Sequence, residues 1–306
     1  KWLKSHTLGR TTFQGADHSQ SLYRDCHGRH GNPPTSTFQP PLPPEPSTGY
    51  SNARCFMNST NNCSTKISRE HWMSHSILRQ MPEIQLRGLP GRRDEIVTLP
   101  ASALVANILC DRHNSALSPL DTAAGNAFDT LGKAMRHLSK PPPNGKRVRW
   151  YIIDGFALEL WAIKALLGVH FGGISADGGV TTRDTLHLDI AEAAAYLAGK
   201  PLDWPLGFYY RSCWIDGAAA SLATLSHGED LGGIRATLQS FTFDSIVALP
   251  GDPDPNKTPR NKHRQAIIEI VGPKTASVLA FAWSGMARGD IYLRTYWPPR
   301  TPWHQE

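Results

Sequence analysis

Two short stretches, CFMNSTNNCSTKISREHWMSH at residues 55–75 and CDRHNSALSPLD at residues 110–121, contain three of the five cysteines of the chain. Cys110 and His113 are separated by two residues, a spacing at which both side chains reach one tetrahedral metal ion. Two more cysteines in the first stretch can complete the site if the polar residues between them form a loop. The sequence therefore predicts a structural zinc ion held by Cys55, Cys63, Cys110 and His113.

Two other interpretations of these residues remain open. One assigns the metal to Cys55, Cys63, His71 and His75, because histidines separated by three residues also have ligand spacing. That set fits the compact two-cysteine, two-histidine finger poorly and leaves the second stretch unused. The other interpretation treats the three thiols as small buried hydrophobic groups.

The composition is that of a chain with a sizeable core. It has 306 residues, of which 40% are hydrophobic and 19% are charged, so two domains are expected. The longest apolar run, Gly155–Val169, is interrupted by Glu159 and Lys164 and is shorter than the roughly 20 residues of a membrane-spanning helix. No membrane span is therefore expected.

The N-terminal sequence and the cysteine count bear on the compartment. The first residues lack the apolar segment of a secretory signal and an initiator Met, which suggests trimming or a fragment. Five cysteines are an odd number, and free thiols fit a reducing compartment better than a set of disulfides. We therefore expect a cytoplasmic protein.

The positive charge is concentrated in the first half of the chain. Residues 1–147 carry 18 Lys and Arg against 10 Asp and Glu, whereas residues 148–306 carry 14 against 16. A basic half attracts polyanions such as nucleic acid, although a small excess of positive charge also occurs in ordinary soluble proteins. A later loop, residues 251–264, is either a solvated loop or a contact for phosphates. Its candidate nucleic-acid-binding residues are Lys257, Arg260, Lys262 and Arg264.

Proline-rich stretches divide the chain. Seven prolines lie between Asn32 and Ser51, and a triple proline follows Ser139, so neither stretch favours a packed helix or strand. The expected order is an extended or disordered leader (1–50), a first compact module (51–138), a linker (139–147), a second domain (148–298) and a tail (299–306).

Several elements are predicted from their periodicity. A strand at residues 147–153 is followed by a buried helix that Asp154 caps, and a later helix ends at Gly199. In the first module, Ser118 is expected to cap a helix that has Pro119 as its first residue. The strand-like runs after residue 233 have short connections and favour an antiparallel sheet, so the fold class is α+β.

The segments SREH (Ser68–His71) and LCDRHN (Leu109–Asn114) resemble the HNH family of ββα-metal endonucleases, in particular its zinc-containing treble-clef members. In that family, an acidic residue followed by His ends the first strand of a hairpin. A zinc knuckle followed by His or Asn then leads into a helix. The resemblance covers about 60 residues, from Cys55 to Asn114. It implies a zinc-stapled ββα module, which the α+β domain with an antiparallel sheet, expected from the periodicity, would follow.

The resemblance also implies roles for individual residues. His71 would be the general base that activates water, and Glu70 and Asn114 would hold one divalent cation, Mg²⁺ or another, at the scissile phosphate. The predicted function is a metal-dependent endonuclease, with DNA favoured over RNA and with homo-oligomerisation through the second domain as an option. The alternative is a catalytically inactive, zinc-dependent nucleic-acid-binding or scaffolding protein, because Trp72 and Met73 replace the usual Pro and Gly after the histidine.

Overall fold

Helices and β-sheets occur throughout the computed structural model, as predicted for the α+β class. The structure describes residues 35–71, 73–79, 84–86, 95, 97–100, 102, 104–139, 148–172, 189–202, 206–212, 220–227, 230–247, 263–272, 274–284 and 292–296. These ranges all belong to one compact unit, Pro33–Glu306. The leader before residue 35, the linker at 140–147 and the tail after residue 298 lie outside the described residues.

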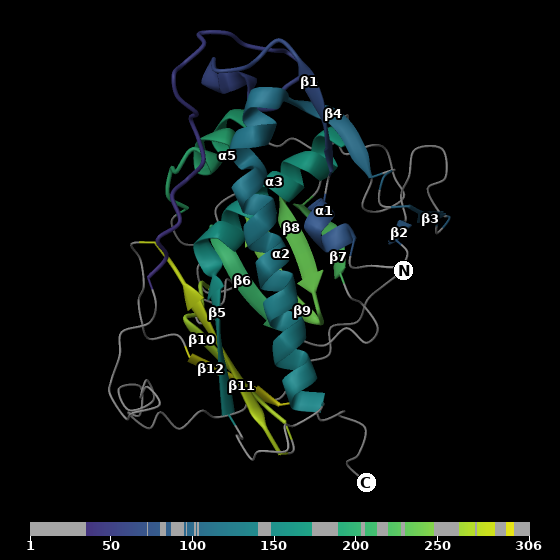
Figure 1. The fold of residues 1–306 in the computed structure, drawn as a ribbon, viewed down its shortest axis with the longest axis vertical. Coiled ribbons are helices and arrows are strands. Elements are labelled where there is room, and N and C mark those ends of the chain that lie inside the picture. The colour runs from purple at the N-terminus through teal and green to yellow at the C-terminus, as the bar shows by residue number, and fades with distance from the viewer. Residues whose placement is uncertain are drawn as a thin grey trace. The chain divides into compact units, whose positions relative to one another are not determined.

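An antiparallel strand pair followed directly by a long helix positions the first stretch of interest (Figure 1). Strand β1 (Ile67–His71) pairs with β4 (Val105–Cys110), and α2 (Asp111–Ser139) begins at the next residue. In this register, Ile67 faces Cys110, and His71 faces Val105. The two cysteine-containing stretches are therefore brought together at one end of the hairpin, and His71 lies at the other end.

Two short helical elements and one more strand pair complete this part of the chain. They are the 3₁₀ turn η1 (Asn58–Thr60), helix α1 (His75–Leu78) and the antiparallel strands β2 (Ile84–Leu86) and β3 (Val97–Leu99). Residue Leu78 of α1 is fully buried, and α1 packs against α2. The loop before β1 and the helix after it are thus both held against the hairpin and α2.

Helix α2 differs from the prediction in where it begins. It runs continuously through Pro119, which was expected as its first residue. Proline lacks the N–H that would bond to the carbonyl four residues earlier, that of Ser115. The Ser118 hydroxyl donates to that carbonyl instead, at 2.9 Å. Pro119 is exposed, and because the helix begins at Asp111, His113 lies in its first turn.

Two four-stranded sheets follow in the second half of the chain. One has the strand order β12-β10-β11-β5 and the other has the order β6-β9-β8-β7. Their strands are β5 (Val148–Asp154), β6 (Gly207–Ser212), β7 (Ala220–His227), β8 (Asp230–Leu238), β9 (Phe241–Ile246), β10 (Ile267–Val271), β11 (Ala276–Ala282) and β12 (Tyr292–Tyr296).

Only one of these sheets is fully antiparallel. In the other, β10 pairs with β11 in an antiparallel arrangement, but β5 pairs with β11 and β10 pairs with β12 in parallel, so a mixed sheet accompanies the antiparallel sheet expected from the short connections. A parallel partner cannot follow through a tight turn. The pairing of β5 with a strand more than 120 residues later is a long-range contact that local sequence periodicity does not specify.

Helix α3 (Gly155–Gly172) is buried on nearly all sides. Its N-terminus is capped as predicted, because Asp154 Oδ1 accepts a hydrogen bond from the Ala157 N–H at 2.9 Å. Of the helices in the described ranges, α3 is the one long and apolar enough to cross a membrane, but 83% of the relevant window is buried inside the protein. That degree of burial is typical of the core helix of a soluble protein. A further helix, α5 (Ile190–Leu197), ends before Gly199, whose φ of +99° matches the predicted C-cap.

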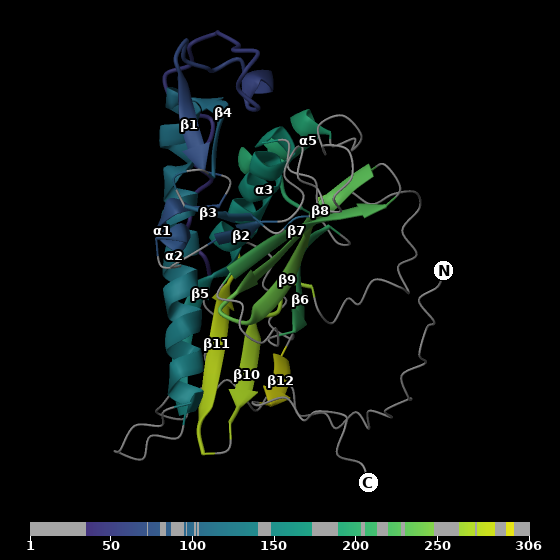
Figure 2. The same cartoon turned by 90° about the vertical axis from the view of Figure 1, so that its right-hand side faces the viewer.

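The two halves of the chain share one hydrophobic core. Helix α2 runs along the mixed sheet (Figure 2), and Ser277 of β11 donates a hydrogen bond to its Ala134 carbonyl at 2.9 Å. One continuous cluster of buried side chains contains Leu109 of β4, Phe128 of α2, Leu166 of α3 and Leu279 of β11. This packing differs from the prediction of two domains separated at residues 139–147. The prolines there interrupt a helix, but the chain returns to pack β5 against α2.

The described end of the proline-rich leader lies along both halves. The Ser36 hydroxyl contacts both carboxylate oxygens of Asp154, at 2.9 and 2.8 Å, close to the start of α3. Further along, the Pro44 carbonyl accepts a hydrogen bond from Arg112 at 2.8 Å. Residues 35–50 therefore form an extended segment that connects the start of α3 to the first turn of α2 (Figure 1).

Candidate metal centre and adjoining pocket

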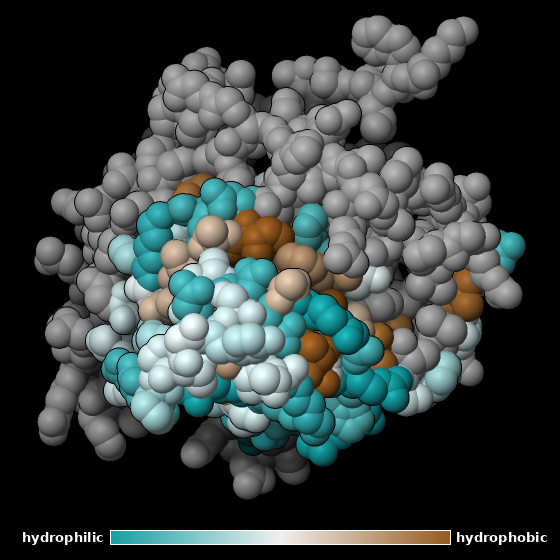
Figure 3. Space-filling model, turned by 90° about the horizontal axis from the view of Figure 1, so that it is seen from above, coloured by the Kyte–Doolittle hydropathy of each residue, from teal (hydrophilic) through white to brown (hydrophobic). Residues whose placement is uncertain are grey.

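The four predicted zinc ligands are brought together in one buried cluster. The ligand atoms of Cys55, Cys63, Cys110 and His113 all lie within 4.8 Å of one another. Two cysteines come from the loops on either side of η1, the third ends β4 and the histidine lies in the first turn of α2. All four side chains are buried. The surface seen from this end of the molecule is mostly hydrophilic in its described part (Figure 3).

The distances within the cluster match a tetrahedral ion. Nδ1 of His113 lies 3.4 Å from Sγ of Cys55, 3.7 Å from that of Cys63 and 3.3 Å from that of Cys110. With Zn–S near ~2.3 Å and Zn–N near ~2.0 Å, the S···N edges of a tetrahedron are about 3.5 Å. The cluster could therefore hold a metal ion such as zinc, and the geometry selects this set over the alternative with His71 and His75.

The protonation of the cluster favours metal binding at one thiol and at the imidazole. Burial alone would raise the pKa of the Cys110 thiol, but several hydrogen bonds, led by those from the backbone N–H groups of His113 and Ser64, together lower it. Burial, and then the neighbouring Arg112, lower the pKa of His113 to about 4. Burial raises the pKa of the other two thiols. Without a cation, Cys55 and Cys63 would therefore be buried neutral thiols, which a metal ion would deprotonate.

A threonine orients the histidine ligand. The Thr60 Oγ1 atom lies 3.1 Å from Nε2 of His113 and donates to the Met57 carbonyl at 2.8 Å. A metal on Nδ1 leaves the imidazole proton on Nε2, where the threonine oxygen can accept it. Such outer partners set the tautomer and ring orientation of metal-bound histidines.

A polar pocket lies at the other end of the hairpin. It has a volume of about 140 Å³ and is lined by Glu70, His71, Ser74, His75, Ser76, Asp121 and Thr122. These residues come from the end of β1, from α1 and its N-cap, and from the middle of α2. Of the three residues to which the resemblance assigns chemistry, two line this pocket and Asn114 does not.

His71 lies at the edge of this pocket and is partly exposed. Its ring centroid is 5.0 Å from that of His75. Burial, and then the neighbouring His75, lower the pKa of His71 below its usual range. The imidazole is therefore neutral near pH 7, which is the state that can accept a proton from water.

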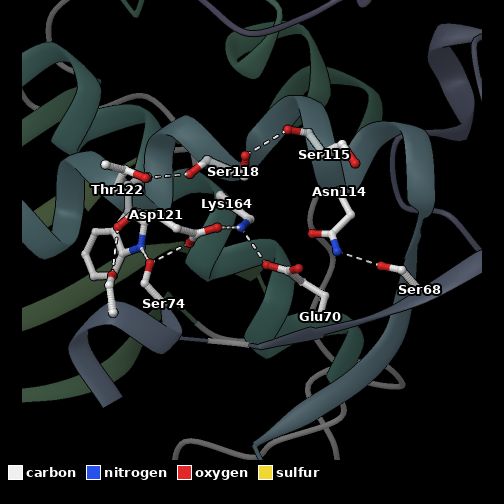
Figure 4. Close-up of polar contacts among 11 residues, drawn as sticks. Ser68, Glu70, Ser74, Asn114, Ser115, Ser118, Asp121, Thr122 and Lys164 are labelled. Atoms are coloured by element: carbon white, nitrogen blue, oxygen red, sulfur yellow. Dashed lines mark hydrogen bonds and ion pairs between the residues drawn. The ribbon is translucent and has the colours of Figure 1, made fainter. Parts of the chain in front are cut away.

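Glu70 is paired with a lysine from the second half of the chain. Lys164 Nζ lies 2.5 Å from Glu70 Oε1, and the same ammonium pairs with Asp121 Oδ2 (Figure 4). Glu70 and Lys164 are 7% and 4% exposed, so this is a buried ion pair. Burial raises the pKa of Glu70, while Lys164 lowers it and Asp121 raises it.

Asn114 faces β1 instead of the pocket. Its Nδ2 donates to the Ser68 hydroxyl at 2.7 Å, which connects the first turn of α2 to the start of β1 (Figure 4). This contact stabilises the hairpin against the helix close to the cysteine cluster.

As the side chains lie, Glu70 and Asn114 do not form the divalent cation site that the resemblance implies. The carboxylate that would bind the ion is already occupied by the Lys164 ammonium, and Asn114 does not line the same pocket. Among the described residues, the metal-capable group is the cysteine cluster alone. In this structure, the two residues predicted as cation ligands take part in two separate polar contacts, Glu70 with Lys164 and Asn114 with Ser68.

One predicted phosphate-binding residue is also used differently. Arg264 donates to Glu159 Oε1 at 2.7 Å and Oε2 at 3.0 Å, and to the Leu202 carbonyl at 2.8 Å. Both charged side chains are buried, so the guanidinium does not face solvent as a phosphate ligand would. The other predicted contacts, Lys257, Arg260 and Lys262, lie outside the described residues.

Sequence reasoning missed three residues of these sites. Thr60, Asp121 and Lys164 were not singled out, although Asp121 ends the second quoted stretch. The detectable signal for Lys164 was its position, because it is one of two charges that interrupt an otherwise apolar helix. A charge in such a helix needs a partner, but the sequence does not show which acidic residues provide it.

Comparisons of the chain with protein-family models, with curated proteins and with solved structures found no match. The resemblance to HNH nucleases therefore rests on the two quoted segments.

Proposed function

We propose that the chain is a zinc-stabilised phosphodiester hydrolase that acts on nucleic acid, with His71 as its general base. The single observation that carries this proposal is the position of His71. A neutral imidazole ends β1 and opens onto a pocket of about 140 Å³, at the end of the β1–β4 pair opposite the buried cysteine cluster.

Zinc is the ion we propose for the cluster. Three thiolates and one imidazole are the soft ligands of structural zinc, and the S···N distances of 3.3 to 3.7 Å agree with it. The closed set of four ligands leaves no open position for substrate. The role of this ion is to hold the loops around η1, the end of β4 and the start of α2 together.

In the proposed reaction, His71 accepts a proton from a water molecule while the water oxygen attacks phosphorus. The P–O bond to the leaving oxygen breaks, and that oxygen receives a proton from solvent. Proton transfer by a positioned histidine contributes roughly 10²–10⁴-fold to such reactions. The divalent cation implied by the resemblance is not assigned to Glu70 and Asn114, because neither side chain is placed to hold it.

The test is cleavage of supercoiled plasmid, linear DNA and RNA by the purified full chain, with Mg²⁺ or with a chelator added just before the assay. His71→Ala should reduce cleavage by about 10²–10⁴-fold at unchanged zinc content. Ser115→Ala, an exposed α2 residue outside the pocket, is the control. Wild-type cleavage by His71→Ala protein would refute the proposal.

A second candidate is a zinc-stabilised protein that binds nucleic acid without cleaving it. The observation that favours it is the engagement of Glu70 with Lys164 and of Asn114 with Ser68. Under this alternative, the wild-type protein binds DNA or RNA but leaves every substrate intact, and His71→Ala does not change the affinity.

A further inference from the structure

Lys164 contacts two carboxylates that line the pocket, although it lies outside the segment that resembles HNH nucleases, Cys55–Asn114. It lies in the middle of α3, whereas its two acidic partners lie on β1 and α2. Lys164 and Trp161 are three residues apart on α3 and therefore share a face of the helix. The Trp161 Nε1–H group donates to the Ser74 hydroxyl at 2.7 Å.

Asp121, the second acidic partner of Lys164, is contacted from several sides. Ser74 donates to Asp121 Oδ1 at 2.5 Å, and Lys164 pairs with Asp121 Oδ2. The Ser76 hydroxyl donates to the Asp121 carbonyl at 2.9 Å. Figure 4 shows the Lys164 amino group between the carboxylates of Asp121 and Glu70. Contacts from α1, α2, α3 and β1 thus set the position of one ammonium between two carboxylates.

The negative charges of Glu70 and Asp121 explain why a cation is needed between them. Two ionised carboxylates this close together repel each other and would carry a formal charge of −2 beside a pocket proposed to receive a phosphodiester. Burial of a lysine is costly unless it is paired, and here the lysine compensates half of that charge. A cation between paired carboxylates is also the arrangement in which proteins hold Mg²⁺ or Mn²⁺.

We propose that the Lys164 ammonium is the resident cation between the Glu70 and Asp121 carboxylates and excludes a divalent metal ion from Glu70. The inference rests on the proposed function, because the chemical purpose of the Lys164 ammonium is to offset the negative charge that would otherwise repel phosphate from His71. Lys164 acts through Glu70 and Asp121 and does not line the pocket itself, so it is a positioning residue.

The test is Mn²⁺ binding to the zinc-loaded full chain, followed by electron paramagnetic resonance, which does not depend on cleavage. Wild type and Glu70→Gln should bind Mn²⁺ equally weakly. Lys164→Met removes the charge at similar length and should gain about one Mn²⁺ per chain, because carboxylates are ligands that Mn²⁺ prefers. The double variant Lys164→Met/Glu70→Gln should lose that gain. Lys133→Met, an exposed lysine on α2, is the matched control and should behave as wild type.

Two results would overturn the inference. The first is a Mn²⁺ site in the wild type that Glu70→Gln abolishes. This comparison uses no Lys164 variant, so it remains decisive even if that variant misfolds. The second is a folded Lys164→Met protein that binds no more Mn²⁺ than wild type does. Neither result depends on whether the protein cleaves nucleic acid. Failure of the cleavage assay alone would refute the proposed function and leave the Mn²⁺ result standing.

Discussion

The side chains of Thr60 and His113 meet at 3.1 Å, between the threonine oxygen and Nε2 of the imidazole. The contact connects η1 to the first turn of α2 on the side of the ring away from the three sulfurs. Since it is the outer partner of a proposed zinc ligand, its loss should weaken the metal site without removing a ligand.

We expect Thr60→Ala to lower zinc affinity by about 10–100-fold, because removal of an outer hydrogen-bond partner frees the ligand ring. The measurement is competition with a chromophoric chelator. Ser59→Ala changes an exposed neighbour and should leave the affinity unchanged. Equal affinities for both variants would mean that Thr60 does not orient His113.

Cys110→Ser should unfold the described unit as a whole. Structural zinc contributes on the order of 10 kcal/mol of apparent binding free energy, and the core that continues from β4 into α3 and β11 leaves no half to fold independently. Near-ultraviolet circular dichroism and metal analysis would be measured together. Cys26→Ser, a cysteine outside the ligand set, is the control. A zinc-free Cys110→Ser protein with a native tryptophan signal would show that the second half folds alone.

The pH dependence of cleavage should follow His71. The neutral form is the base, so the rate rises with pH through the pKa of His71 and is constant above it. Because burial and His75 lower that pKa, activity should persist below the ordinary histidine pKa of about 6.5. His75→Ala removes one of these causes and should move the midpoint to higher pH. A midpoint that is unaffected by His75→Ala, or that lies above the ordinary value, would contradict this assignment.

Arg264→Gln should reduce stability and leave nucleic-acid affinity unchanged. The substitution leaves Glu159, which is 1% exposed, without its charged partner, and breaking such a buried pair costs about 3–5 kcal/mol. Urea unfolding gives the change in the free energy of unfolding. Lys133→Gln breaks an exposed pair with Asp129 and should cost below about 1 kcal/mol. Loss of nucleic-acid binding at full stability would restore the original interpretation of Arg264 as a phosphate ligand.

The sequence predicted the cysteine cluster because part of its information is local. Cys110 and His113 are close in the chain, and short spacing restricts where their side chains can point. The cap of α3 by Asp154 is local in the same sense, and the structure confirms it. The cap requires only a few neighbouring residues to adopt a standard conformation, whereas the cluster also depends on the pairing of β1 with β4, which brings its two stretches together.

The features that differ from the predictions depend on long-range packing. Nothing near Glu70 indicates that a lysine from α3 will neutralise it, and nothing near β5 specifies β11 as a parallel partner. Pro119 normally indicates a helix start, but the earlier start at Asp111 follows from the strand pair and cluster that precede it. Tertiary contacts here override local preference.

The most direct test of the account is chemical rescue of a His71→Gly variant by imidazole. The variant removes the proposed base and enlarges a pocket of about 140 Å³ that already opens to solvent. Cleavage of a labelled DNA strand should fall by about 10²–10⁴-fold and should recover as imidazole is added, in proportion to the neutral form of imidazole. A His71→Gly protein that retains its zinc and cleaves at the wild-type rate without imidazole would contradict the account.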